Sequence, residues 1–343
     1  MLRPTIEDVA RIAGVSIATV SRCLHMPDVV AVKTRERILS AVLQTGYTLN
    51  TAAQSLRQRR SNTVLVVVPD IGNTFFAEIL GGIEQVASAA GLTMLIGDTG
   101  RNIDREQSYM RYLLNGRADG ALLLAEPQAA WFDVPTANSV GIKPIVTISE
   151  VGPGHETVAV SIDNEAASRR AVEHLMRQGH RRIAHLTGPQ SNILTQARLN
   201  GYRHALRDAG IKLQDTFEIP GDFSMASGRQ AFGSFRAMPD KPTAIFCAND
   251  ESAMGFIAAA HLAGVMVPRD ISVVGFDDIH FAQCFIPALT TVHQPRVEMG
   301  AAAMRLLLSI MANETPQSIQ LESNLVLRDS TAVVNDLPGR HSY

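Results

Sequence analysis

Apolar residues recur every three or four positions over the first 46 residues, which predicts a series of short amphipathic helices. Thr5, with Asp8 three residues later, has the pattern of a helix N-cap followed by an acidic first turn. The buried face of this helix is expected to hold Ile6, Val9, Ala10 and Ala13. Gly14 ends the helix and Ser16 caps the next one, so a tight turn joins the two.

The second helix is expected to keep Val20 and Leu24 inward, and a third helix over about 33–45 ends at Gly46. Glycine is the usual residue where a helix ends in the left-handed conformation. Two short helices connected by a tight turn with glycine indicate a helix-turn-helix.

From residue 63 the pattern changes to that of buried strands. VLVVVP is a run of β-branched residues, as expected of a strand covered on both faces. A first series has a helix over about 75–90 and strands near 92–97, 119–124 and 144–148, with helices between them. After Ser161, a second series has helices over 164–178, 195–209, 225–236 and 250–263 and strands over 182–187, 243–247 and 271–275. Such alternation predicts two lobes, each a parallel sheet with helical crossovers.

Residues 47–60, YTLNTAAQSLRQRR, separate the two patterns. The segment is polar, rich in alanine and basic at its end, with too little apolar surface to fold alone. Its composition taken alone is also consistent with a plain linker.

Charge is distributed unevenly along the chain. Residues 1–60 hold nine Lys and Arg against four Asp and Glu, a net +5, whereas the rest of the chain carries a net −7. A basic head on an acidic body suggests that only the head meets an anionic partner.

Three widely spaced cysteines favour a reducing cytoplasm, and acidic residues near the N-terminus argue against a signal peptide. No apolar stretch approaches the roughly 20 residues of a membrane span. We therefore expect a cytoplasmic protein with no membrane partner.

The outward face of the second helix carries small and mixed side chains, which are Ile17, Ala18, Ser21 and Arg22. Ile17 and Ala18 can contact thymine methyl groups in a major groove, and Arg22 can pair with guanine O6 and N7. Phosphate contacts, which position a protein without specifying sequence, would come from Arg3, Lys33, Arg35 and Arg37. The pattern alone also fits a small helix with a solvated face.

Context resolves this ambiguity. TIEDVARIAGVSIATVSRCL resembles the DNA-binding head of the LacI/GalR repressor family, and GYTLNTAAQSL resembles its hinge helix. Blocks similar to its effector-binding core follow in order: VLVVVPDIGNTFFAEILGGIE, GHRRIAHLTGP, AIFCANDESAMGF, DISVVGFDD and PALTTVHQP. The resemblance covers about residues 5–332 and implies a bacterial, nucleoid-associated regulator.

The family implies three parts. Residues 1–48 would be the helix-turn-helix domain, 49–61 the hinge, and 62–335 a bilobed core for effector binding and dimerisation. We place the N-lobe at about 62–160 and 293–320, and the C-lobe at about 161–292 and 321–335. The expected fold class is an all-α head plus an α/β core of two parallel-sheet lobes, like that of periplasmic binding proteins.

The resemblance also implies a mode of DNA binding. The expected contacts to double-stranded operator DNA are Thr5, Ser16, Ile17, Ala18, Thr19, Ser21 and Arg22 in the head, and Asn50, Ala53, Leu56 and Arg57 in the hinge. Two hinges of a homodimer would become helical on a palindrome, with Leu56 inserted into the minor groove as a wedge that kinks the duplex. Leu49, Gln54 and Ala31 depart from the proline, arginine and serine that the family often has.

Ligands of parallel α/β folds bind at the carboxyl ends of the strands, where DIGNTFF, TGPQSNILTQAR, CANDE and GFDDIHF fall. The resemblance implies an effector cleft lined by Phe75, Phe76, Asn192, Arg198, Phe223, Asn249, Asp250 and Asp277. Arg198 donates in a fixed fork and Asp277 accepts, which suits adjacent hydroxyls on a sugar or ribose ring. Phe76 is also consistent with plain core packing, and Asp250 with a plain helix cap.

The effector class stays open between a sugar, a nucleoside and a related metabolite. VPDI, IGD, GDF and PALTT are similar to the cytidine repressor branch of the family, which suggests a nucleoside, but sugar-responsive members share these features. Asn192 and Leu194 stand where purine-binding relatives have arginine and threonine, which disfavours a purine base.

Other classes of protein fit less well. A solute-binding protein with the same core and no regulatory role would need a signal peptide and no DNA-binding head. For an enzyme, no GxSxG, GxxxxGK[ST] or GxGxxG motif follows a strand, and no Cys–His cluster has metal-ligand spacing. His174 and His180 are interpreted as surface residues beside a loop. We expect no catalytic residues, metal or cofactor.

Overall fold

The computed structural model describes residues 4–47, 60–124, 144–149 and 157–334, and the chain separates into two compact units between Ser61 and Asn62. The first unit, the head, contains α1 (Ile6–Ala13), α2 (Ile17–His25), the short 3₁₀ turn η1 (Pro27–Val29) and α3 (Val32–Thr45). Its core consists of Val9, Ala10, Ala13, Val20, Cys23, Ile38 and Ala41.

The ends of the head helices follow their local sequence. Thr5 and Asp8 form a reciprocal capping box at α1, and Gly14 ends that helix with a φ of +61°. Ala31 is the N-cap residue of α3 and supplies no side-chain hydrogen bond to the first turn. Cys23 takes an inward position, whereas Leu24 is only partly buried, so α2 is rotated slightly from the orientation expected from its pattern.

Arg37 has a structural role within the head. Its Nε donates to the carbonyl oxygen of Ala13 at 3.2 Å, and its Nη2 also contacts Ala13 O and lies 3.2 Å from Gly14 O. The guanidinium therefore caps the end of α1, which differs from the phosphate contact expected for it.

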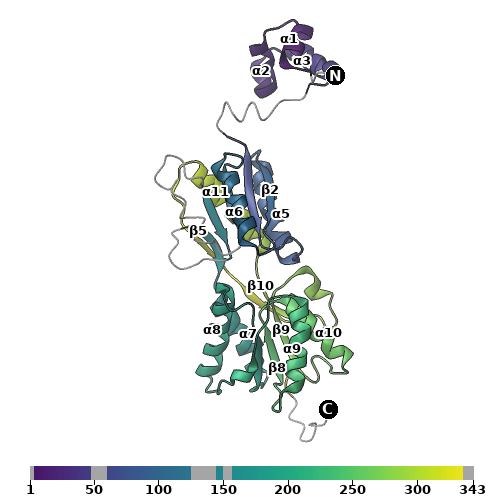
Figure 1. Ribbon diagram of the computed structural model, residues 1–343, viewed down its shortest axis with the longest axis vertical. Helices are drawn as coiled ribbons and strands as arrows, with labels where there is room; N and C mark the ends of the chain where they lie inside the picture. Colours follow the sequence, from purple (N-terminus) through teal and green to yellow (C-terminus); the bar gives the residue numbers. More distant parts are fainter. Residues whose placement is uncertain (1–3, 48–59, 125–143, 150–156, 335–343) are drawn as a thin grey trace. The chain divides into compact units, whose positions relative to one another are not determined.

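The N-lobe is a six-stranded sheet of order β11-β5-β4-β3-β1-β2, in which all pairs are parallel. Its strands are β1 (Thr63–Val68), β2 (Thr93–Asp98), β3 (Gly120–Leu123), β4 (Ile145–Ile148), β5 (Val158–Ile162) and β11 (Ile319–Leu321). Its helices are α5 (Thr74–Ala89), α6 (Ile103–Leu114) and α11 (Arg296–Met311) (Figure 1). β1 lies between β3 and β2, and its residues Val64 to Val68 are apolar on both faces and buried, as expected of a strand covered on both sides.

The C-lobe repeats this architecture with the order β12-β10-β9-β8-β6-β7, in which only β12 is antiparallel to its neighbour. Its strands are β6 (Ile183–Leu186), β7 (Glu218–Ile219), β8 (Ala244–Cys247), β9 (Ser272–Asp277), β10 (Thr290–His293) and β12 (Asn324–Val326). Its helices are α7 (Asn164–Arg177), α8 (Ile193–Asp208), α9 (Met225–Ala237) and α10 (Asp250–Leu262) (Figure 1).

The chain passes between the lobes three times: from β5 into α7, from β10 into α11, and from β11 into β12. The α11 crossover is stiff at its N-lobe end because α11 packs on α5 backbone to backbone. A Cβ atom on Gly82 would lie 2.0 Å from the carbonyl oxygen of Val297, so only glycine fits there.

The interpretation of His174 and His180 as surface residues is wrong. Both are buried, because the C-terminal segment covers them. His180 contacts the hydroxyls of Thr243 and Ser272 at 2.9 and 3.1 Å and the carbonyl oxygen of Ala332 at 3.0 Å. Burial lowers the pKa of both imidazoles.

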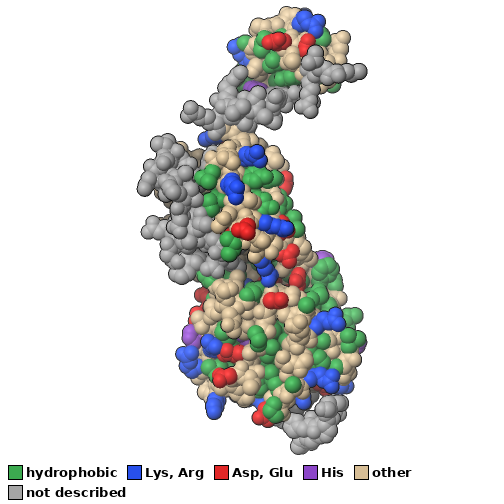
Figure 2. All heavy atoms as spheres, viewed as in Figure 1, with side chains coloured by type: hydrophobic (Ala, Val, Ile, Leu, Met, Phe, Trp, Pro, Cys, Tyr) green, Lys and Arg blue, Asp and Glu red, His purple; other side chains and the backbone are tan. Residues whose placement is uncertain are grey.

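Acidic and basic side chains are interspersed over both lobes on the face shown in Figure 2. Among the described residues, no helix is long and apolar enough to cross a bilayer.

Candidate functional site

The outward face of α2 is available to a partner. Ile17 is 45% exposed, Ala18 and Arg22 are exposed, and Thr19 and Ser21 are partly buried. Ser16 caps the helix by accepting the amide of Thr19 at 3.2 Å. The helix thus presents one cation and several small side chains on a rigid support.

The remaining expected DNA contacts are Thr5 in the head and four positions in the hinge. Thr5 is already engaged, with its hydroxyl 2.9 Å from Asp8 Oδ2. The hinge positions Asn50, Ala53, Leu56 and Arg57 lie outside the described residues, together with Leu49 and Gln54.

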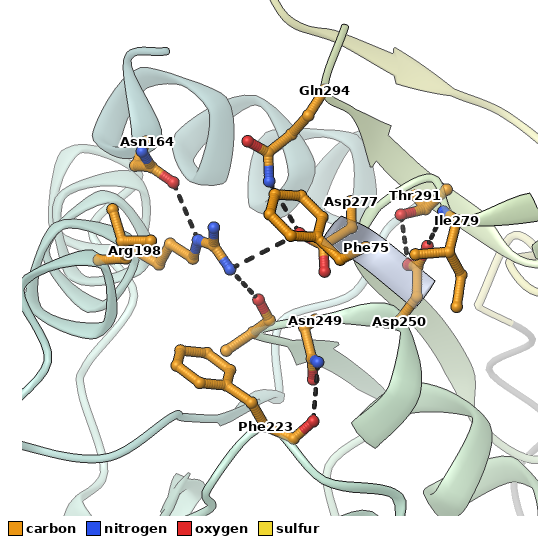
Figure 3. Close-up of polar contacts among 12 residues, drawn as sticks. Phe75, Asn164, Arg198, Phe223, Asn249, Asp250, Asp277, Ile279, Thr291 and Gln294 are labelled. Carbon is orange, nitrogen blue, oxygen red and sulfur yellow. Dashed lines mark hydrogen bonds and ion pairs between the residues drawn. The ribbon is translucent and has the colours of Figure 1, made fainter. Parts of the chain in front are cut away.

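Arg198 of α8 is buried, with 3% of its surface exposed. Its Nε donates to Asn164 Oδ1 at 3.0 Å and its Nη1 to the carbonyl oxygen of Ala248 at 2.5 Å. The guanidinium carbon lies 3.8 Å from the centre of the Phe276 ring, which adds a desolvated cation–π contact. These contacts fix the guanidinium before any ligand arrives (Figure 3).

Asp277, at the end of β9, faces Arg198 (Figure 3). Its Oδ1 lies 3.9 Å from Arg198 Nη1 and accepts a hydrogen bond from Gln294 Nε2 at 2.8 Å. Burial raises the pKa of this carboxyl to about 6, although the charges of Arg198 and Arg296 oppose the rise. The ion pair and the hydrogen bond both involve Oδ1, so the other oxygen is suited to accept a ligand hydroxyl.

Aromatic rings come from both lobes. Phe75, at the start of α5, is nearly buried and packs edge to face with Phe76 at a ring distance of 5.2 Å. Phe76 also packs on the hydrophobic core of the lobe. Phe223, in the C-lobe loop before α9, has a φ of +70°, and its carbonyl accepts a hydrogen bond from Asn249 Nδ2 at 2.8 Å. A Cβ on Gly188 would lie 2.2 Å from Phe223 Cζ, so glycine is required for this ring position.

Asn249 caps α10, since its Oδ1 accepts the amide of Ser252 at 3.1 Å. The cap interpretation of Asp250 is therefore wrong. Asp250 is fully buried, and its two oxygens accept hydrogen bonds from Thr291 Oγ1 (2.5 Å) and the amide of Ile279 (2.9 Å). Burial raises the pKa of Asp250, and its bonds tie the loop after β9 to β10.

Asn192 is likewise a helix cap: its Oδ1 accepts the amides of Leu194 and Thr195 at the start of α8. Between the lobes, Arg101 of the N-lobe donates from Nη1 to the carbonyl oxygen of Asp222 in the C-lobe at 3.2 Å.

The structure brings together Phe75, Arg198, Phe223, Asn249 and Asp277 (Figure 3). Sequence reasoning missed Asn164, Phe276 and Gln294, which support Arg198 and Asp277. Their signal was positional, because each stands at the end of a strand or in a crossover, where the edges of the two sheets meet. The assembled donors, acceptor and rings suit the binding of a small polar molecule.

Comparison with known proteins finds matches for both the helical head and the two-lobed core. Residues 5–50 match the lacI family of bacterial regulatory proteins, and residues 172–331 match the periplasmic-binding-protein-like domain. The match to a regulatory head distinguishes the chain from a solute-binding protein that shares only the core.

Full-length relatives are transcriptional regulators. The chain is 38% identical over 329 residues to the HTH-type transcriptional repressor CytR of Escherichia coli K12, covering 95% of this chain and 96% of that protein. It is 35% identical over 337 residues to the HTH-type transcriptional repressor PurR of Photobacterium profundum, covering 96% and 99%.

Solved structures agree. The Lac repressor dimer bound to operator and the anti-inducer ONPF gives a TM-score of 0.86 at 29% identity, covering 96% of this chain and all of that one. The transcriptional regulator CelR in complex with cellobiose gives 0.71 at 33% identity, with the same coverage. The resemblance and the fold class inferred from the sequence are thus confirmed: the chain belongs to the LacI family of bacterial regulatory proteins and is a DNA-binding transcriptional repressor with a periplasmic-binding-protein-like core.

Proposed function

We propose that the protein binds a palindromic operator as a homodimer, and that a sugar or a nucleoside in the interlobe cleft controls this binding. The observation that carries the proposal is the pair formed by Arg198 and Asp277. Both side chains are buried, and the groups around them hold them 3.9 Å apart. A fixed donor beside a fixed acceptor suits the two neighbouring hydroxyls of a pyranose or a ribose.

The rings support the same ligand class. Phe75 and Phe223 can contact the apolar face of a sugar or stack on a base, an interaction worth about 1–3 kcal/mol per base. Asn192 and Leu194 disfavour a purine, so the nucleoside candidates are pyrimidine nucleosides. Among neighbours in structure, CelR was solved with cellobiose and the Lac repressor with ONPG, which is consistent with a hydroxylated ligand.

On DNA, α2 would lie in the major groove, with Ile17 and Ala18 against thymine methyl groups and Arg22 on guanine. Thr5, Ser16, Thr19 and Ser21 would contact the backbone or base edges beside them. In the hinge, Asn50, Ala53 and Arg57 would follow the minor groove, with Leu56 inserted at the centre of the palindrome.

In vitro selection of the full chain on random duplex DNA tests the DNA-binding proposal. We expect enrichment of one palindromic sequence, bound with a stoichiometry of two chains per duplex. Enrichment of sites without two-fold symmetry, or binding of a single chain, would refute the dimeric mode.

The same operator tests the wedge. Leu56→Ala should reduce the bend angle measured by circular-permutation electrophoresis, because no side chain then unstacks the central base step. Base preferences at the outer positions read by α2 should persist. An unchanged bend angle would exclude Leu56 as the wedge.

A further inference from the structure

One arginine reaches from the N-lobe to the end of the C-lobe strand that carries Asp277. Arg296 is the first residue of α11, which packs tightly on α5. Its side chain is 3% exposed. Nη1 donates to the carbonyl oxygen of Asp277, and Nη2 donates to that of Asp278 at 2.7 Å. The same Nη2 lies 2.8 Å from Glu78 Oε1 on α5. A single side chain therefore connects helices α5 and α11 of the N-lobe to the carboxyl end of β9 in the C-lobe sheet.

The backbone that Arg296 holds has an unusual conformation. Asp277 and Asp278 are consecutive non-glycine residues with φ values of +115° and +56°. Such conformations are costly and persist only where surrounding contacts enforce them. Because Arg296 binds the carbonyl oxygens of both residues, it fixes the peptide planes that determine where the Asp277 side chain points.

Other groups also hold this turn: the amide of Gln294 donates to the carbonyl oxygen of Asp277 at 3.4 Å, and the amide of Ile279 donates to Asp250 at 2.9 Å. Arg296 is the side chain that binds the carbonyl oxygens of both Asp277 and Asp278. The Asp278 carboxylate is already bound by Arg328 at 2.7 Å and by His293 at 2.9 Å, so it does not compete for the Arg296 guanidinium. Gln294, from the same crossover, binds Oδ1 of Asp277 directly. The crossover into α11 therefore holds Asp277 at its carboxylate through Gln294 and at its carbonyl through Arg296.

We propose that Arg296 is a positioning residue that couples the arrangement of the two lobes to the orientation of the Asp277 carboxylate. When α11 moves away from the end of β9, the 277–278 turn loses both donors, and the acceptor in the cleft loses its fixed direction. Glu78 supports the coupling by holding the guanidinium at the N-lobe. The ligand role of Asp277 rests on the proposed function, whereas the coupling itself requires neither ligand nor DNA.

Single-molecule energy transfer on the full chain tests this coupling. Dyes would be attached at Leu114→Cys in the N-lobe and Leu262→Cys in the C-lobe, both at exposed positions, in a Cys284→Ser background that removes the exposed native thiol. Labelled chains are diluted into unlabelled protein, so that each oligomer carries one pair. Arg296→Lys keeps the charge but lacks the planar fork that reaches several acceptors at once. Arg305→Lys is the matched control, because Arg305 lies on the same helix and pairs with Glu298 at 3.0 Å in an exposed ion pair.

We expect one narrow transfer peak for the wild type and for Arg305→Lys. Arg296→Lys should raise the population with the longer interlobe distance by about tenfold, since it weakens charge-assisted hydrogen bonds. Glu78→Gln should raise it by a smaller factor. If Arg296→Lys folds and leaves the distribution unchanged, or if Arg305→Lys alters it equally, the coupling is refuted.

Glu78→Gln keeps the test decisive even where Arg296→Lys does not fold. It preserves the arginine and both carbonyl contacts, so an unchanged distance distribution in this variant would also overturn the coupling. A wrong effector class or operator would affect neither result, because the measurement uses the protein alone.

Discussion

The head and the cleft carry their functional side chains in opposite ways. On α2 the expected reading residues Ile17, Ala18 and Arg22 are exposed, on a helix that packs on a small core. In the cleft, Arg198 and Asp277 are buried and already hydrogen-bonded within a large lobe. A side chain fixed in advance loses little entropy when a ligand binds, whereas an exposed one is ordered only at the DNA surface. The comparison teaches that the cleft depends on preorganisation and the head on the stability of a small core.

The largest difference between the head and the two-lobed core is expected when a buried side chain of the head is shortened. Ile38 of α3 is fully buried, and Ile38→Ala should cost about 2–5 kcal/mol. Because a domain of this size is marginally stable, operator binding should be lost at 37 °C, roughly the working temperature of a mesophile. Ligand-induced stabilisation of the core should persist. Fluorescence anisotropy measures operator binding, and thermal melting measures the stabilisation by ligand. If Ile38→Ala abolishes both, the head and the core do not fold independently.

The buried carboxylate predicts a pH dependence confined to the core. The pKa of Asp277 is raised from 3.8 to about 6, so the folded state binds this proton more tightly than the unfolded state does. The resulting stability is present below the unfolded pKa and is lost as the pH rises through the folded value. Relative to Asp277→Asn, wild-type core stability should fall by on the order of 2–3 kcal/mol between about pH 4 and about pH 7. If the free energies of unfolding of the two proteins, from denaturation curves, change with pH in the same way across that range, the pKa of the Asp277 carboxyl is not raised.

A smaller effect is expected at the exposed surface of α2. Arg22→Ala should weaken binding to the selected operator by about 1–3 kcal/mol and binding to random DNA much less. Competition binding at constant salt measures both. Equal losses on the two DNAs would assign Arg22 to the phosphates.

The smallest effect is a gain. Ala31, the N-cap residue of α3, has no capping side chain, and Ala31→Ser should stabilise the head by about 0.5–1 kcal/mol. Chemical denaturation monitored by hydrogen exchange of head amides would detect it. No gain would mean that the serine hydroxyl does not reach the amides of the first turn.

Local signals explain what the sequence could predict. The helices of the head and the strand–helix alternation follow from apolar periods and from caps such as Thr5 and Ser16, which act within a few residues. β11 and β12 have three residues each, too few to show a period. Their positions depend on pairing with distant strands.

Local sequence patterns could not predict the residues that hold Arg198 and Asp277 in place. Asn164 and Arg296 belong to different crossovers, and only the folded core brings them to Arg198 and Asp277. His180 was misassigned for a similar reason, since the segment that buries it is about 150 residues away in the chain. Contacts between distant segments are set by topology, which local pattern does not encode.

The most direct test of the central claim is a thermal-melt screen of the full chain against nucleosides, pentoses and hexoses, with Asp277→Asn alongside. A ligand present at about 100 times its dissociation constant should stabilise the wild type by about 2.7 kcal/mol. The account predicts that one chemical class shifts the wild-type melting temperature, that the shift is lost in Asp277→Asn, and that the same class changes operator affinity, since coupling between sites is reciprocal. A ligand that stabilises both proteins equally, or leaves operator affinity unchanged, would contradict it.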